Sequence, residues 1–136
     1  MTEDKLVAII SDIHGNSWAL EKVLEDIESR GIKTILNLGD SLYGPLDPKG
    51  TFELISCKGL NLLSICGNQD RVILENLELK SNSPTLEFVK SQLDTDIKSW
   101  LKSLAFDLNF EDTIYCCHAS PASDSISSWK ISNRIL

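Results

Sequence analysis

The chain has 136 residues, of which 42% are hydrophobic and 24% are charged, as in ordinary folded domains. This composition excludes a disordered, collagen-like or coiled-coil chain, and no apolar run approaches the roughly 20 residues of a membrane-spanning helix. Thirteen basic and 20 acidic residues give a net charge of −7, which disfavours a nucleic-acid partner because such a surface repels phosphate unless a bound divalent ion reverses the local sign.

In the first half of the chain, short apolar runs alternate with helical patterns. The run 5–10 is continuously apolar after Lys5, which is typical of a strand buried on both faces. A helix is expected between a cap at Asn16 or Ser17 and a left-handed end at Gly31. A Gly- and Pro-rich loop should follow the second strand. The expected later elements are strands at 34–38 and 61–65, a loop at 41–50, and helices at 51–57 and 71–79. This order predicts a parallel α/β sheet.

The second half predicts two further helices and a hairpin. Ser83-Pro84 is a typical helix opening, and a short helix capped by Thr95 should follow it. Segments 106–110 and 113–117 flank a polar turn and indicate an antiparallel hairpin. The last 15 residues are rich in serine and weakly patterned.

Potential metal ligands stand at the ends of four predicted strands. They are Asp12 and His14 after the first strand, Asp40 after the second, Asn68 after the third and His118 after the last. In open α/β sheets, sites lie outside the carboxyl ends of the strands, so these side chains should converge. Carboxylate, imidazole and amide donors suit Mn²⁺, Fe or Zn²⁺ better than a soft thiolate site does. The glycines beside them allow sharp turns or close backbone approach to an ion or phosphate.

These motifs together resemble the calcineurin-like metallophosphoesterase superfamily, most closely its small bacterial and archaeal phosphodiesterase branch. The resemblance covers most of the chain and rests on Ser11-Asp12-Ile13-His14-Gly15-Asn16, Gly39-Asp40, Gly67-Asn68-Gln69-Asp70 and His118-Ala-Ser-Pro121. It implies a four-layer α/β/β/α sandwich that hydrolyses a small phosphoester, a phosphodiester or nucleotide-like molecule, with two divalent metal ions and a bridging hydroxide. Mn²⁺ is the expected metal, with Fe, Zn²⁺ and Ni²⁺ as alternatives.

The resemblance also implies a role for each ligand. Asp12 and His14 would bind one metal, Asn68 and His118 the other, and Asp40 would bridge them. Catalysis would then depend on Asp40, Asn68 and His118. Asn16 and Gln69 would contact the substrate.

Two departures from the family pattern qualify this reading. Many members have a histidine general acid at position 69, oriented by the aspartate that follows; Gln69 cannot donate a proton in that way. The late Gly-His-x-His motif is also missing, which leaves each metal one protein ligand short. We therefore expect residues 1–136 to form a single but incomplete, C-terminally truncated domain, or a fragment or alternative product of a longer enzyme. Its alternative function is that of a weakly active or inactive metal- or phosphate-binding module acting through a homo-oligomer or a complementing chain.

The four cysteines offer a further alternative chemistry. They form no Cys-x-x-Cys pair and are too few and too irregular for a disulfide framework. Cys116 and Cys117 precede His118, but they alternate along a predicted strand, which favours packing over a nucleophilic role. With no secretory signal at the start of the chain, a reduced cytoplasmic protein without a membrane partner is expected.

Overall fold

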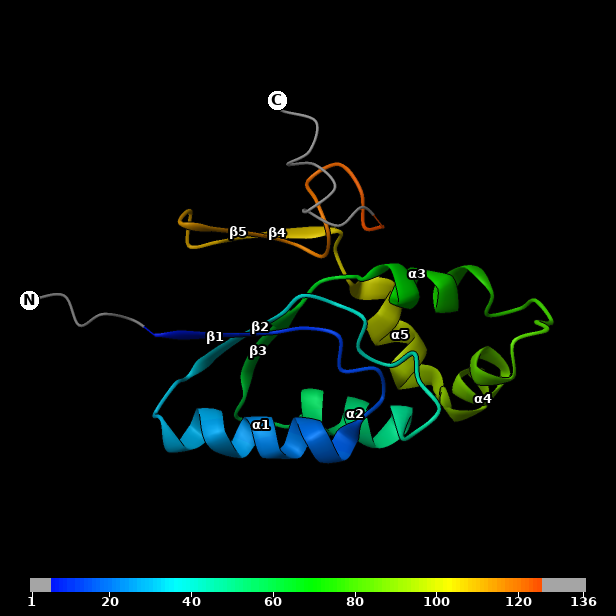
Figure 1. Cartoon of the computed structure of the whole chain (residues 1–136), viewed down its shortest axis with the longest axis horizontal. Helices are drawn as coiled ribbons and strands as arrows, with labels where there is room; N and C mark the ends of the chain where they lie inside the picture. The colour runs from blue at the N-terminus through cyan, green and yellow to red at the C-terminus, as the bar shows by residue number, and fades with distance from the viewer. Residues whose placement is uncertain (1–5, 126–136) are drawn as a thin grey trace, which may run out of the picture.

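A parallel sheet of three strands forms the centre of the structure, a computed structural model that describes residues 6–125 (Figure 1). The strands are β1 (Val7–Ile10), β2 (Thr34–Asn37) and β3 (Asn61–Ser64), in that order across the sheet. All four residues of β2 are buried, as expected for a central strand covered on both faces. The predicted parallel α/β unit is therefore confirmed. The burial on both faces expected for the first strand is wrong, because β1 is an edge strand and is only partly buried, with Ile9 56% exposed.

The two faces of this sheet are covered by different layers. Helices α1 (Ser17–Ser29) and α2 (Pro48–Ile55) lie on one face, and the antiparallel hairpin of β4 (Asp107–Phe110) and β5 (Ile114–Cys117) lies on the other (Figure 1). A buried cluster of Leu36, Ile65 and Cys116 joins sheet and hairpin. Helix α2 begins earlier than expected, because Asp47 caps it and Pro48 occupies its first turn.

Three short helices pack together beyond the carboxyl ends of the strands. They are α3 (Asn68–Glu75), α4 (Pro84–Gln92) and α5 (Thr95–Ser103). Their shared core is fully apolar and also takes in a residue of the loop after β2: Leu42, Ile73, Leu86, Val89, Leu93, Ile97 and Leu101. The cap of α5 is Asp94, whose carboxylate accepts the Ile97 amide; Thr95 was the wrong residue. Helix α3 begins at Asn68 instead of 71, which places this predicted ligand in its first turn.

The α/β class predicted from the sequence is therefore present. Within residues 6–125, the helices α1 and α2, the parallel sheet and the hairpin supply three layers of the expected α/β/β/α order. Most of the weakly patterned C-terminal segment lies outside the described residues. No helix in the described range combines the length and the apolar character that crossing a membrane requires.

Candidate metal centre

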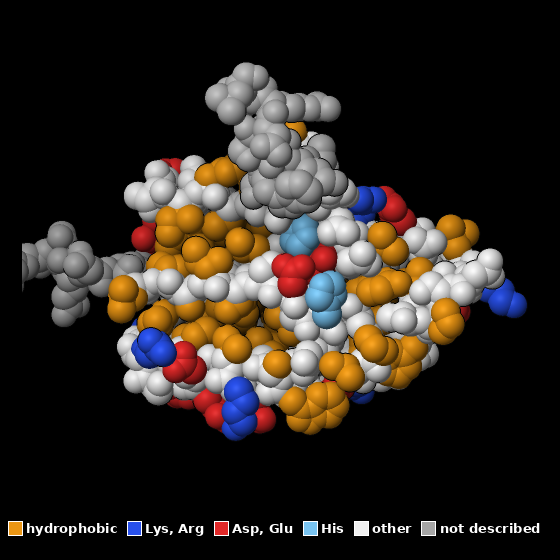
Figure 2. Space-filling view, viewed as in Figure 1, with side chains coloured by type: hydrophobic (Ala, Val, Ile, Leu, Met, Phe, Trp, Pro, Cys, Tyr) orange, Lys and Arg blue, Asp and Glu red, His pale blue; other side chains and the backbone are white. Residues whose placement is uncertain are grey.

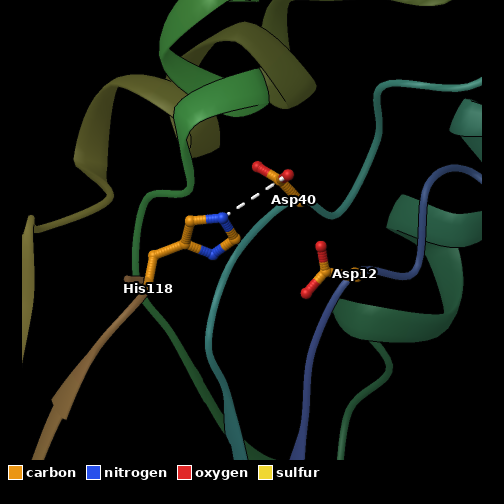
Figure 3. Close-up of side chains that lie close together, drawn as sticks. All are labelled: Asp12, Asp40 and His118. Carbon is orange, nitrogen blue, oxygen red and sulfur yellow. Dashed lines mark ion pairs between the residues drawn. The ribbon is translucent and has the colours of Figure 1, made fainter. Parts of the chain in front are cut away.

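The five predicted ligands come together at the carboxyl end of the sheet. Asp12 and His14 lie in the loop after β1, Asp40 in the loop after β2, Asn68 in the first turn of α3, and His118 directly after β5. Figure 2 shows the two histidines flanking a group of acidic side chains on the surface. Figure 3 shows Asp12, Asp40 and His118 pointing toward one another from three separate elements.

Backbone pairing fixes the first two loops against each other. The amide of Asp12 donates to the carbonyl of Gly39 at 3.0 Å, and the amide of His14 donates to the carbonyl of Asp40 at 3.0 Å. These bonds continue the parallel pairing of β1 and β2 beyond the ends of the strands. The register of the sheet therefore determines where the ligands of the two loops meet.

The ligand atoms lie close enough to share metal ions. One ligand atom each from Asp12, Asp40 and His118 lies within 4.8 Å of the others. The Nε2 atom of His14 is 3.5 Å from Asp12 Oδ1 and 3.9 Å from Asp40 Oδ2. On the other side, His118 Nε2 is 3.5 Å from Asp40 Oδ2 and 2.9 Å from Asn68 Oδ1. Asp40 therefore lies between two groups of donors.

Both histidines are oriented through the other nitrogen of the ring. His14 Nδ1 lies 2.9 Å from the carbonyl oxygen of Tyr43, and His118 Nδ1 lies 2.7 Å from that of Leu38. A carbonyl only accepts, so each Nδ1 must carry a proton and donate it. In a neutral His14 ring, Nε2 then has a lone pair that faces the carboxylates of Asp12 and Asp40. In His118, Nε2 lies 2.9 Å from Asn68 Oδ1, which is also only an acceptor, so a proton or a cation must lie between these two atoms. This is the arrangement by which proteins prepare a histidine to bind a metal.

The loops hold their ligands in a backbone conformation that is unfavourable for most residues. Asp12, His14 and Asp40 have φ values of 57°, 51° and 55°. The left-handed region costs a non-glycine residue on the order of 1 kcal/mol, and such strain gathers at functional sites. Two glycines permit the close contact between the loop after β2 and the start of α3. A Cβ on Gly39 would lie 2.4 Å from the Gly67 nitrogen, and one on Gly67 would lie 2.2 Å from Asp40 Oδ1.

Asp70 joins the loop after β2, which carries Asp40, to the start of α3. Its carboxylate accepts the amides of Asp40, Ser41 and Gly67 at 2.8, 3.0 and 3.0 Å. The side chain is completely buried. Burial raises the pKa of the Asp70 carboxyl, and the three backbone donors act in the opposite direction. Sequence reasoning missed this contact because it joins loops 30 residues apart.

The two predicted substrate-binding residues have clear structural contacts. Asn16 caps α1 by accepting the amide of Ala19 at 3.1 Å, and it also lines a groove beside Asp12. The backbone amide of Gln69 donates to Asp40 Oδ1 at 2.8 Å. The predicted role of Gln69 concerns its side chain, whereas this contact is made by its backbone. Cys116 is buried, and this burial raises its thiol pKa, which fits the packing role favoured above.

Comparison with known proteins identifies similar chains. The family model for calcineurin-like phosphoesterases matches residues 5–135. An uncharacterized protein of Methanocaldococcus jannaschii is 48% identical over 69 residues, which are 51% of this chain and 28% of that protein. The crystal structure of a metallophosphoesterase from Sphaerobacter thermophilus superposes with a TM-score of 0.72 at 30% identity, over 89% of this chain and 49% of that one.

A second solved structure, named "putative diadenosine tetraphosphatase", has a TM-score of 0.68 at 27% identity, over 84% of this chain and 50% of its own. The chain thus spans about half the length of these solved relatives and a smaller part of the curated one.

Proposed function

The chain belongs to the calcineurin-like phosphoesterase family. On that premise, we propose that it hydrolyses a small phosphoester with divalent metal ions bound at the centre around Asp40. The proposed substrate class is a phosphodiester or nucleotide-like molecule. This choice rests on the resemblance to the small phosphodiesterase branch and on the neighbour named as a tetraphosphatase.

The convergence of lone-pair donors around Asp40 carries the proposal. Two histidine Nε2 atoms and the oxygens of Asp12, Asp40 and Asn68 face one another. Within residues 6–125, no lysine or arginine lies within ion-pairing distance of Asp12 or Asp40. Carboxylates in such a cluster repel one another unless a cation lies between them. The donor set therefore fits divalent metal ions.

We propose two metal positions that share Asp40. One would be held by Asp12, His14 and Asp40, and the other by Asp40, Asn68 and His118. Mixed oxygen and nitrogen ligands suit Mn²⁺, Fe, Zn²⁺ or Ni²⁺, and we propose Mn²⁺ among them because the family resemblance implies it. When bound, such a pair supplies Lewis acidity to the phosphoryl oxygens and activates water, the chemistry that the predicted bridging hydroxide represents.

The chain's own residues would orient the centre without supplying a general acid. Asp40 Oδ1 is fixed by the amide of Gln69, which leaves Oδ2 facing both histidines. The Gln69 side chain cannot protonate a leaving oxygen at ordinary pH. We therefore propose a substrate with a good leaving group, or one whose leaving oxygen takes its proton from water.

Metal analysis and turnover of bis(4-nitrophenyl) phosphate test this proposal. The full chain should bind close to two Mn²⁺ ions and hydrolyse the diester. Asp40→Asn should lower turnover at least about 100-fold, because it removes the carboxylate shared by both positions. Asp94→Asn is the matched control, since it makes the same chemical change at a helix cap away from the centre. Wild-type turnover by Asp40→Asn would disprove the shared position, and an absence of metal binding would disprove the function.

The other candidate function is a binding module that works through a second chain. The difference in side-chain exposure between the two sides of the centre favours this candidate. The side chains of Asp12 and His14 are 55% and 43% exposed, whereas those of Asp40 and His118 are 5% and 9% exposed. The open side leaves room for a ligand from a homo-oligomer or a complementing chain. Light scattering with and without Mn²⁺ tests this candidate: a metal-dependent doubling of mass supports it, and a monomer that is fully active excludes it.

A further inference from the structure

The buried carboxylate of Asp70 joins the loop after β2 to the start of α3. Oδ2 accepts the amides of Asp40 and Gly67, and Oδ1 accepts the amide of Ser41. We propose that Asp70 is a positioning residue, which holds Asp40 in its metal-binding conformation by fixing the backbone on both sides of the centre. This inference rests on the proposed function, because it assigns Asp70 a part in metal affinity.

Asp40 needs such support because its own backbone conformation is unfavourable. Its φ of 55° lies in the left-handed region, where the chain turns sharply after β2. Asp40 is also buried, with only 4% of its surface exposed. A buried amide without a partner is costly, and Asp70 supplies that partner for two successive residues, Asp40 and Ser41.

The same helix turn also orients the Asp40 side chain. The Gln69 amide donates to Asp40 Oδ1, and the missing side chain of Gly67 makes room for that oxygen. Asp70 binds the amide of Gly67 and so fixes this turn relative to Asp40. Figure 3 shows the start of α3, in green, beside Asp40. The start of α3 therefore holds Asp40 in two ways: Asp70 accepts its backbone amide, and the Gln69 amide donates to its side chain. Asp70 contributes to both, because it also fixes the turn that carries the Gln69 amide.

All three amides can be satisfied at once by a carboxylate but not by a side-chain amide. Aspartate offers two acceptor oxygens, whereas asparagine offers one oxygen and an NH₂ group that donates. In Asp70→Asn the NH₂ group must therefore face at least one backbone N–H, and at least one of the three bonds is lost. The substitution keeps the size of the side chain, so it tests the hydrogen bonds without opening a cavity.

Amide exchange and Mn²⁺ binding, both measured on the full chain, test the inference. In the metal-free Asp70→Asn variant, the amides of Asp40, Ser41 or Gly67 should exchange at least tenfold faster than in the wild type. The Kd for Mn²⁺ should rise by about 10- to 100-fold, the range typical of groups that orient metal ligands. The matched control is Asp94→Asn, which makes the same chemical change at the cap of α5 and should leave the Kd unchanged.

The outcomes separate this inference from the proposed function. A folded Asp70→Asn chain with wild-type Kd and exchange rates overturns the inference and leaves the function standing. A wild-type chain that binds no Mn²⁺ overturns the function, and with it the role in metal affinity. If Asp70→Asn does not fold, exchange in the wild type decides: the three amides should be protected at least 100-fold relative to a free peptide, and free-peptide rates overturn the inference.

Discussion

Replacing Gly67 by alanine should displace Asp40 without straining the backbone at position 67. Gly67 has a φ of −88°, a conformation open to any residue, so the added methyl group acts by contact alone. Its Cβ would lie 2.2 Å from Asp40 Oδ1 and 2.4 Å from the Asp40 nitrogen. Carbon and oxygen atoms normally approach to about 3.5 Å, so the two loops must separate by about 1 Å.

We expect this separation to affect stability and metal binding together. Overpacking of this kind costs about 1–3 kcal/mol in the free energy of unfolding. The Kd for Mn²⁺ should rise at least about tenfold, because Asp40 Oδ2 would move away from at least one of the two histidines. Urea unfolding and isothermal titration with Mn²⁺ measure the two effects separately.

Gly31→Ala provides the control. Gly31 has a φ of 70° at the end of α1, and a Cβ there would meet nothing within 4 Å. Its replacement should cost about 1 kcal/mol through backbone strain and leave the Kd for Mn²⁺ unchanged. A Gly67→Ala chain that is destabilised like Gly31→Ala but binds Mn²⁺ with wild-type affinity would refute the reasoning that loop contact determines the position of Asp40.

Three further predictions concern regions around the centre. Leu101→Ala should lower the free energy of unfolding by about 2–5 kcal/mol, measured in urea, because Leu101 is fully buried among α3, α4 and α5; a loss below 1 kcal/mol would contradict this packing. Arg71→Gln should cost about 0.5–1 kcal/mol at pH 7, because Arg71 donates to Asp124 at 2.7 Å and lowers the pKa of that carboxyl. This contribution should disappear as the pH falls through the lowered pKa of Asp124, so an equal cost at pH 2 would speak against the ion pair. Burial raises the pKa of the Cys66 thiol to about 11, so iodoacetamide at pH 8 should alkylate exposed Cys57 first in a mass-spectrometric time course; equal rates would contradict the burial of Cys66.

The sequence predicted the elements that have a strong local signal. The apolar runs of β1 and β2 and the cap-and-proline start of α4 lie where the pattern placed them. Helix α2 starts earlier than predicted because the Pro and Gly residues of segment 41–50 are typical of a loop, although Asp47-Pro48 is itself a capped helix start. The start of α3 was missed for a different reason: its N-terminal amide is capped from within the helix, by Asp70 reaching back to Gly67.

The ligand side chains could be predicted because metal chemistry is specific about residue type. Only a few side chains supply the required oxygen or nitrogen atoms, and four strand ends carried them. The groups that orient these ligands could not be predicted from residue type in the same way. His14 and His118 are oriented by the backbone carbonyls of Tyr43 and Leu38, and any residue at those two positions would supply the same atom.

The centre thus combines ligand side chains, whose residue type is specific, with supporting groups that are mostly backbone atoms. Asp40 illustrates both: its carboxylate could be read from a Gly-Asp pair, but its orientation depends on the backbone amide of Gln69 and on the absence of a side chain at Gly67. Asp70 is the exception among the supports, since it acts through a side chain and so can be removed by substitution. The affinity of the centre for metal should therefore respond more strongly to Asp70 and Gly67 than to the side chains at positions 38 and 43, whose contribution to the histidines is made by the backbone alone.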